Sequence, residues 1–132
     1  MNNEVITFYS KTPPNKVALE NFDVKFSEEN RSCSDDITVY LKIDDNKISD
    51  WGFEGITSII TTATSSVFGE SIVGMSLEEV LQKDYNYIVE LVGEEISPRR
   101  QKSSVFGLLA TRNAIHKYLN DGLTDTFLYV LP

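Results

Sequence analysis

The sequence predicts an α+β fold, with a small three-stranded antiparallel sheet packed against several helices. Apolar and polar residues alternate in the first half of the chain, which is the period-two pattern of half-buried strands. Apolar residues at helical spacing dominate the chain after Ser58. Strands followed by helices are typical of a layered α+β fold, and 132 residues fit one domain spanning residues 1–132.

The three strands are expected at residues 22–26, 37–43 and 48–53. In the first two, apolar residues occupy every second position and polar residues lie between them. The run Asp44-Asp45-Asn46-Lys47 supplies turn residues between the second and third strands. A sheet with one polar face needs helices to cover the other face.

The helices are expected on both sides of these strands in the sequence. Helical spacing of apolar residues predicts helices at 3–10, 58–69, 76–82, 85–92 and 101–120. Their limits are marked by the Pro13-Pro14 pair, a Ser76/Glu79 capping box and a break at Pro98. Gly122 suits the end of the last and longest one. The apolar tail 126–131 is expected to add a strand or to pack on a partner.

Composition and charge exclude several classes of function. The net charge of −8 disfavours nucleic-acid binding. The sequence has one dense cluster of basic residues, formed by Arg99, Arg100 and Lys102. A single cysteine excludes an intramolecular disulfide. The N-terminus has no basic region followed by an apolar core, and no apolar run reaches the length of a membrane span. We therefore expect a soluble cytoplasmic protein.

The one cysteine, Cys33, is the most informative residue. Asp35 follows it by two places, just before an alternating strand. A carboxylate there can share a cation with a thiolate or hold a positive charge that keeps the thiol reactive. From spacing alone, a small apolar residue without a chemical role is the favoured interpretation of Cys33.

Six segments between Tyr9 and about Leu119 follow one another in a recognisable order. They are Tyr9-Ser10-Lys11-Thr12-Pro13-Pro14-Asn15-Lys16, Asn30-Arg31-Ser32-Cys33-Ser34-Asp35, Lys47-Ile48-Ser49-Asp50-Trp51-Gly52-Phe53-Glu54-Gly55, Ile59-Ile60-Thr61-Thr62-Ala63-Thr64-Ser65-Ser66, Gly74-Met75-Ser76-Leu77-Glu78-Glu79-Val80 and Pro98-Arg99-Arg100-Gln101-Lys102-Ser103. Together they resemble the IscU/NifU/SufU family of iron–sulfur cluster assembly scaffolds, and the resemblance implies a SufE/NifU-like fold.

The resemblance implies a site of three cysteines and an aspartate around one metal or nascent cluster. Its first cysteine corresponds to Cys33 and its aspartate to Asp35, but its second and third cysteines correspond to Ser58 and Ser103. A shift in the third position would bring Phe106 or Gly107 there instead of Ser103. Lys102 stands where the IscU branch has a histidine.

These replacements change the chemistry that the resemblance implies. A thiolate is a soft ligand near neutral pH, whereas a serine hydroxyl is hard and stays protonated. Zinc and cluster iron need several thiolate or imidazole ligands, so we expect weak or no stable binding of zinc or an iron–sulfur cluster at Cys33 and Asp35.

Two functions remain open. The first is a scaffold-like carrier, not a turnover enzyme, which receives a persulfide sulfur on Cys33 from a cysteine desulfurase. Asp35 and Lys102 would tune the Cys33 thiolate, and apo iron–sulfur proteins would be further partners. The second is a protein-binding or regulatory module that keeps the fold without sulfur chemistry. No membrane or nucleic-acid partner is expected.

Other polar residues are expected to be structural. His116 falls within the apolar arc of the helix at 101–120, and no hydrolase triad accompanies it. Asp44-Asp45 and Glu94-Glu95 lack the spacing of a calcium loop and fit solvated turns. The segment 57–66 lacks the glycines and lysine of a phosphate-binding P-loop. Trp51 and Phe53 are expected in the core of the sheet.

Overall fold

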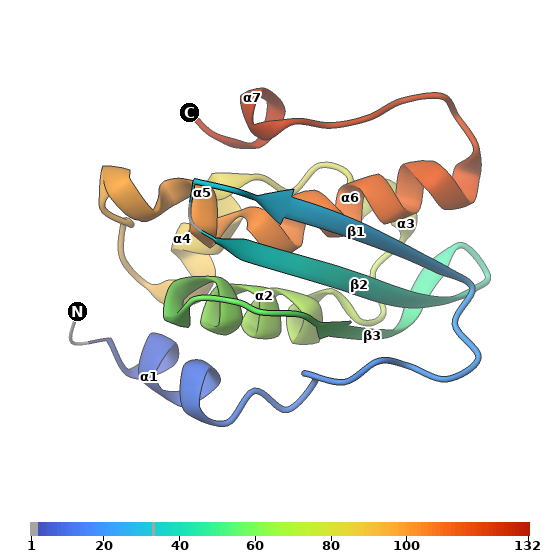
Figure 1. The fold of residues 1–132 in the computed structure, drawn as a ribbon. Coiled ribbons are helices and arrows are strands. Elements are labelled where there is room, and N and C mark those ends of the chain that lie inside the picture. The colour runs from blue at the N-terminus through green and yellow to red at the C-terminus, as the bar shows by residue number, and fades with distance from the viewer. Residues whose placement is uncertain (1–2, 33) are drawn as a thin grey trace.

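The computed structural model describes residues 3–32 and 34–132, which fold into a three-stranded sheet with helices packed against it (Figure 1). In chain order the elements are α1 (Glu4–Lys11), β1 (Val24–Asn30), β2 (Asp35–Asp44), β3 (Lys47–Glu54), α2 (Ile59–Ile72), α3 (Leu77–Val80), α4 (Tyr85–Val92), the 3-10 turn η1 (Pro98–Arg100), α5 (Gln101–Ser104), α6 (Phe106–Leu119) and α7 (Phe127–Val130). The predicted fold class is therefore confirmed.

The sheet is a meander in the order β1-β2-β3, and both neighbouring pairs are antiparallel. Asp45 and Asn46 connect β2 to β3, and both have positive φ, as the tight turn of a two-residue hairpin requires. Between Lys42 and Ile43 the register with β3 shifts by one residue. This bulge lets Ile48 and Trp51, three residues apart, both be buried.

Helices cover one face of the sheet. α6 packs against β1 and β2, α2 packs against β3, and α1 lies against the far side of α2 (Figure 1). The chain between α1 and β1 passes the free edge of β3, where the Phe53 amide donates to the Asn15 carbonyl oxygen at 3.2 Å. Gly52 is needed at this close approach, because a Cβ there would lie 2.5 Å from the Val17 carbonyl oxygen.

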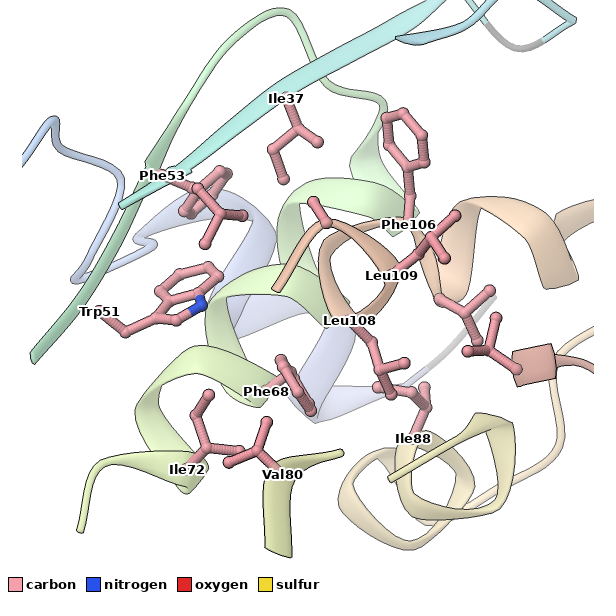
Figure 2. Close-up of a cluster of buried hydrophobic side chains, with 14 of the residues drawn as sticks. Ile37, Trp51, Phe53, Phe68, Ile72, Val80, Ile88, Phe106, Leu108 and Leu109 are labelled. Atoms are coloured by element: carbon pink, nitrogen blue, oxygen red, sulfur yellow. The ribbon is translucent and has the colours of Figure 1, made fainter. Parts of the chain in front are cut away.

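The core lies between the sheet and the helices. Trp51, Phe53 and Ile37 point from the sheet toward apolar side chains of the helices, such as Phe68 and Leu108 (Figure 2). As predicted, the Trp51 and Phe53 side chains are buried. The Trp51 indole N–H donates to the Thr111 hydroxyl at 3.0 Å, which satisfies its one polar group inside the core.

The last long helix differs from the prediction. Instead of one helix over 101–120, the chain forms η1 and α5, breaks at Val105, and continues as α6. The Val105 amide turns back to the carbonyl oxygens of Lys102 and Ser103, and its φ and ψ of −108° and 5° leave the helical region. The break lets α5 contact α2 and α4 while α6 runs beneath the sheet. α6 ends on Asn120 in the left-handed conformation rather than at Gly122.

The C-terminal tail does not add a strand, which is one of its two expected roles; the other, packing on a partner, stays a prediction. Residues Phe127–Val130 form one turn of helix, the Phe127 ring stacks on Phe106 with centroids 6.3 Å apart, and Val130 is buried. An apolar run this short fits either a strand or a helical turn, and contacts with α6 decide between them. None of the described helices has both the length and the hydrophobicity to cross a membrane.

Two local predictions are confirmed by hydrogen bonds. The Ser76 hydroxyl accepts the Glu79 amide at 3.1 Å, although α3 ends at Val80, before Gln82. His116 is buried and lies between two carboxylates, with Nδ1 2.8 Å from Asp121 Oδ2 and Nε2 3.0 Å from Asp125 Oδ2. His116 therefore anchors the segment after α6, as a structural residue does.

Candidate functional site

Asp35 is the centre of a polar cluster that joins the sheet to α2. Its side chain is 3% exposed at the first position of β2. Oδ1 accepts the Ser58 amide at 2.7 Å, and Oδ2 accepts the Thr61 hydroxyl at 2.6 Å. A buried carboxylate needs such donors, and here the N-terminal turn of α2 supplies them.

Ser58 is the N-cap residue of α2. Its hydroxyl oxygen accepts the Thr61 amide at 3.3 Å and lies 3.0 Å from the Thr61 hydroxyl. Ser at an N-cap is favoured because its side chain satisfies an amide that the first helical turn leaves unpaired. A cysteine is a weak substitute in this role, so the serine suits the helix better than it suits a soft metal.

Ser103 is brought to the same place from α5. Its carbonyl oxygen lies 3.3 Å from the Thr61 hydroxyl, and the residue is 5% exposed. Three of the residues predicted for the site, Asp35, Ser58 and Ser103, are thus gathered around Thr61. Sequence reasoning missed Thr61, although its spacing of three residues from the N-cap Ser58 is a usable signal.

One predicted site residue, Lys102, stands apart from this cluster. Lys102 is exposed, and its ammonium lies 5.5 Å from the centre of the Phe127 ring, within range of a cation–π contact. Cys33 lies outside the described residues. On either side of its loop, Asn30 and Asp35 are register partners at the ends of β1 and β2.

Next to the polar cluster is a pocket of about 560 Å³. It lies between α1, the start of α2 and the η1–α5 segment, and Ser58 and Ser103 both contribute to its wall. The wall is formed by Ile6, Thr7, Ser10, Lys11, Ser58, Ile59, Ile60, Arg99, Arg100 and Ser103. Of these described residues, three are basic and none is acidic. Sequence reasoning noted Arg99 and Arg100 only as a basic cluster.

The fold is a small α+β domain, with a meander sheet over α2 and α6 and a polar cluster at the start of α2. Residues 1–124 match the NifU-like N terminal domain family. The chain belongs to this family.

Curated relatives carry names from the same assembly systems. The iron–sulfur cluster assembly scaffold protein IscU of Streptococcus pyogenes is 30% identical over 92% of this chain and 87% of its own length. IscU of Thermotoga maritima is 35% identical over 61% of this chain, and the match spans only 56% of the Thermotoga protein. The zinc-dependent sulfurtransferase SufU of Bacillus subtilis is 29% identical over 70% of this chain and 62% of its own length.

Solved structures agree with the fold. A protein from Fervidobacterium islandicum, described as a candidate cluster assembly scaffold of the SUF system, superposes with a TM-score of 0.75 at 26% identity, over 85% of this chain and 94% of its own. A NifU-like protein from Brucella abortus gives a TM-score of 0.73 at 18% identity over 92% of this chain and 95% of its own, and it supports the fold alone.

The described donors do not fit a bound zinc ion or cluster. Both oxygens of Asp35 are engaged by donors from α2, and Ser58 and Ser103 offer hydroxyls in place of thiolates. Within residues 3–32 and 34–132, no group of three His, Cys, Asp or Glu side chains is arranged to hold a metal ion. The basic wall of the pocket also opposes a cation.

Proposed function

We propose that this protein is a sulfur carrier of iron–sulfur cluster assembly, which accepts a persulfide sulfur on Cys33 from a cysteine desulfurase. It would pass that sulfur on to an iron–sulfur assembly partner or an apo protein, and act as a carrier rather than as a turnover enzyme. Family membership supports the setting, since named relatives include both scaffolds and a sulfurtransferase.

One observation carries the choice of a carrier over a cluster-holding scaffold. Asp35, Ser58 and Ser103 are gathered within hydrogen-bonding reach of Thr61, and two of these three positions carry hydroxyls. Since the chain has one cysteine, Cys33 would be the only thiolate available to such a site. One thiol can carry a sulfur atom, whereas a cluster needs several thiolate ligands.

The transfer step balances without an added oxidant. The Cys33 thiolate attacks the outer sulfur of the desulfurase persulfide, the sulfur–sulfur bond of that persulfide breaks, and the desulfurase thiolate leaves. A new persulfide forms on Cys33. The oxidation level of the transferred sulfur is unchanged, and the proton lost from Cys33 ends on the desulfurase thiol or in water.

Intact-mass analysis tests the proposal. The protein is incubated with a cysteine desulfurase and free cysteine, and its mass is measured before and after reduction. We expect a reducible gain of one sulfur atom, which is absent in Cys33→Ala and present in Ser103→Ala. If the desulfurase binds but no sulfur is gained, the chain is a protein-binding module and the carrier proposal fails.

A further inference from the structure

The pocket beside Ser58 and Ser103 has an electrostatic character opposite to that of the whole chain. The protein has a net charge of −8, yet Lys11, Arg99 and Arg100 line this one hollow together. Among the described residues, none of the three has a carboxylate within 4.0 Å. Unpaired cations facing a shared hollow concentrate positive potential there.

The start of α2 adds backbone donors to the same wall. Ile59 and Ile60 are the first two residues of this 14-residue helix, and both line the pocket. Ser58 and Thr61, on either side, have their amides bound by Asp35 and by the Ser58 hydroxyl. The amides of Ile59 and Ile60 have no acceptor within the described chain. Free amides at a helix N-terminus favour an anion.

Ser103 provides an independent observation. The residue is 5% exposed and lines the pocket, and its hydroxyl makes no hydrogen bond to any described residue. By contrast, the hydroxyl of its neighbour Ser104 donates to the Gln101 carbonyl oxygen at 2.7 Å. The residue is more than nine-tenths buried, and its unpartnered hydroxyl is reached from the pocket, so a ligand there with acceptor oxygens could accept its hydrogen bond.

We propose that this pocket binds a small tetrahedral oxyanion of the phosphate or sulfate class. The two guanidinium groups and the Lys11 ammonium supply charge, the amides of Ile59 and Ile60 supply directed donors, and the Ser103 hydroxyl supplies the innermost donor. The inference goes beyond sulfur transfer, because binding can be measured without a desulfurase.

Titration with inorganic phosphate, and separately with sulfate, tests the proposal. Amide chemical shifts of the full chain are followed by NMR at constant ionic strength, with potassium chloride as the reference salt. Three variants are compared with the parent protein: Arg99→Gln/Arg100→Gln, Ser103→Ala and the control Arg31→Gln. Arg31 has an exposed side chain and lies outside this pocket.

We expect saturable shifts at Ile59 and Ile60 with phosphate or sulfate and none with chloride. The double arginine variant should weaken binding at least about tenfold, since each lost bond to a charged group is worth about one such factor. Ser103→Ala should weaken it about threefold or more, and Arg31→Gln should leave it unchanged. The proposal is overturned if neither oxyanion gives a saturable response, or if Arg31→Gln lowers affinity as much as the double variant. Because Arg99 and Arg100 are exposed, their variant tests the site even if Ser103→Ala does not fold.

Discussion

The Thr61 hydroxyl donates to Asp35 Oδ2 across 2.6 Å, and this bond ties the first turn of α2 to the first residue of β2. It closes a contact between residues 26 positions apart in the sequence, inside a cluster shielded from water. Asp35 is therefore held by structural bonds to α2, whatever it does toward Cys33.

Thr61→Val tests the strength of this link. The change keeps the shape of the side chain and removes the donor, so the buried Asp35 carboxylate keeps one of its two bonds. We expect a loss of about 1–3 kcal/mol in the free energy of unfolding, measured by urea denaturation. Thr64→Val is the matched control, because the Thr64 hydroxyl bonds only the carbonyl oxygen of Ile60 in its own helix. An equal loss in both variants would contradict a special role for the bond to Asp35.

The sequence predicts those parts of the fold that depend on local pattern. Alternation locates all three strands, and the helix over Tyr85–Val92 is found at its observed bounds. The first strand is displaced, because Phe22 at its predicted start is 38% exposed and the pairing with β2 continues to Asn30. Apolar spacing alone does not mark where pairing begins and ends.

Features that depend on distant contacts could not be predicted in this way. The helical spacing of Val105, Leu108 and Leu109 continues through the break at Val105, so the pattern hides the turn between α5 and α6. The candidate site also depends on contacts between segments that are distant in the sequence. A family resemblance brings Asp35, Ser58 and Ser103 together, but only the packing of α1 and η1 shows that cations line the adjacent pocket.

Ser65 and Ser66 are neighbours in α2 with opposite expected effects on stability. The Ser65 hydroxyl is buried without a hydrogen-bond partner, where α2 passes so close to α6 that a Cβ on Gly107 would lie 2.2 Å from it. The Ser66 hydroxyl donates to Asn15 Oδ1 at 2.5 Å and so ties α2 to the chain after α1.

Ser65→Ala is expected to leave the free energy of unfolding unchanged or to raise it by up to about 1 kcal/mol, because it removes an unsatisfied polar atom. Ser66→Ala is expected to lower it by about 1–2 kcal/mol, because it leaves the Asn15 acceptor without that donor. Urea denaturation of both variants checks the pair. Destabilisation by Ser65→Ala equal to that by Ser66→Ala would show that the Ser65 hydroxyl has a partner.

Acid stability should depend on Asp121. The pKa of Asp121 lies below its ordinary value of 3.8. The main cause is the hydrogen bond with the His116 side chain, and the hydrogen bond from the Leu123 amide is the next largest. The unfolded chain then binds a proton more readily than the folded protein does. The stability that this carboxylate contributes is therefore fully present at pH values above 3.8, and it is lost as the pH falls through the lowered pKa of the folded protein.

Asp121→Asn removes that contribution. Thermal unfolding followed by circular dichroism should show the variant melting below the parent protein at neutral pH, with the difference shrinking as the pH falls well below 3.8. Asp44→Asn is the control, because the exposed Asp44 carboxylate has no hydrogen bond or ion pair among the described residues. A difference that stays constant with pH would contradict the link to titration of Asp121.

Placing thiols at Ser58 and Ser103 tests whether these two positions, together with Cys33 and Asp35, can form a zinc site. Ser58→Cys/Ser103→Cys would give three thiols and the Asp35 carboxylate at the positions that the family resemblance assigns to ligands. Three thiolates and a carboxylate suit tetrahedral zinc, so we expect about one zinc per chain after purification with zinc, measured by elemental analysis. The parent protein should retain much less zinc.

Ser58→Cys/Ser104→Cys is the matched control, because it has the same number of thiols but Ser104 does not line the pocket. Equal zinc in the two double variants would show that Ser103 is not the third ligand position.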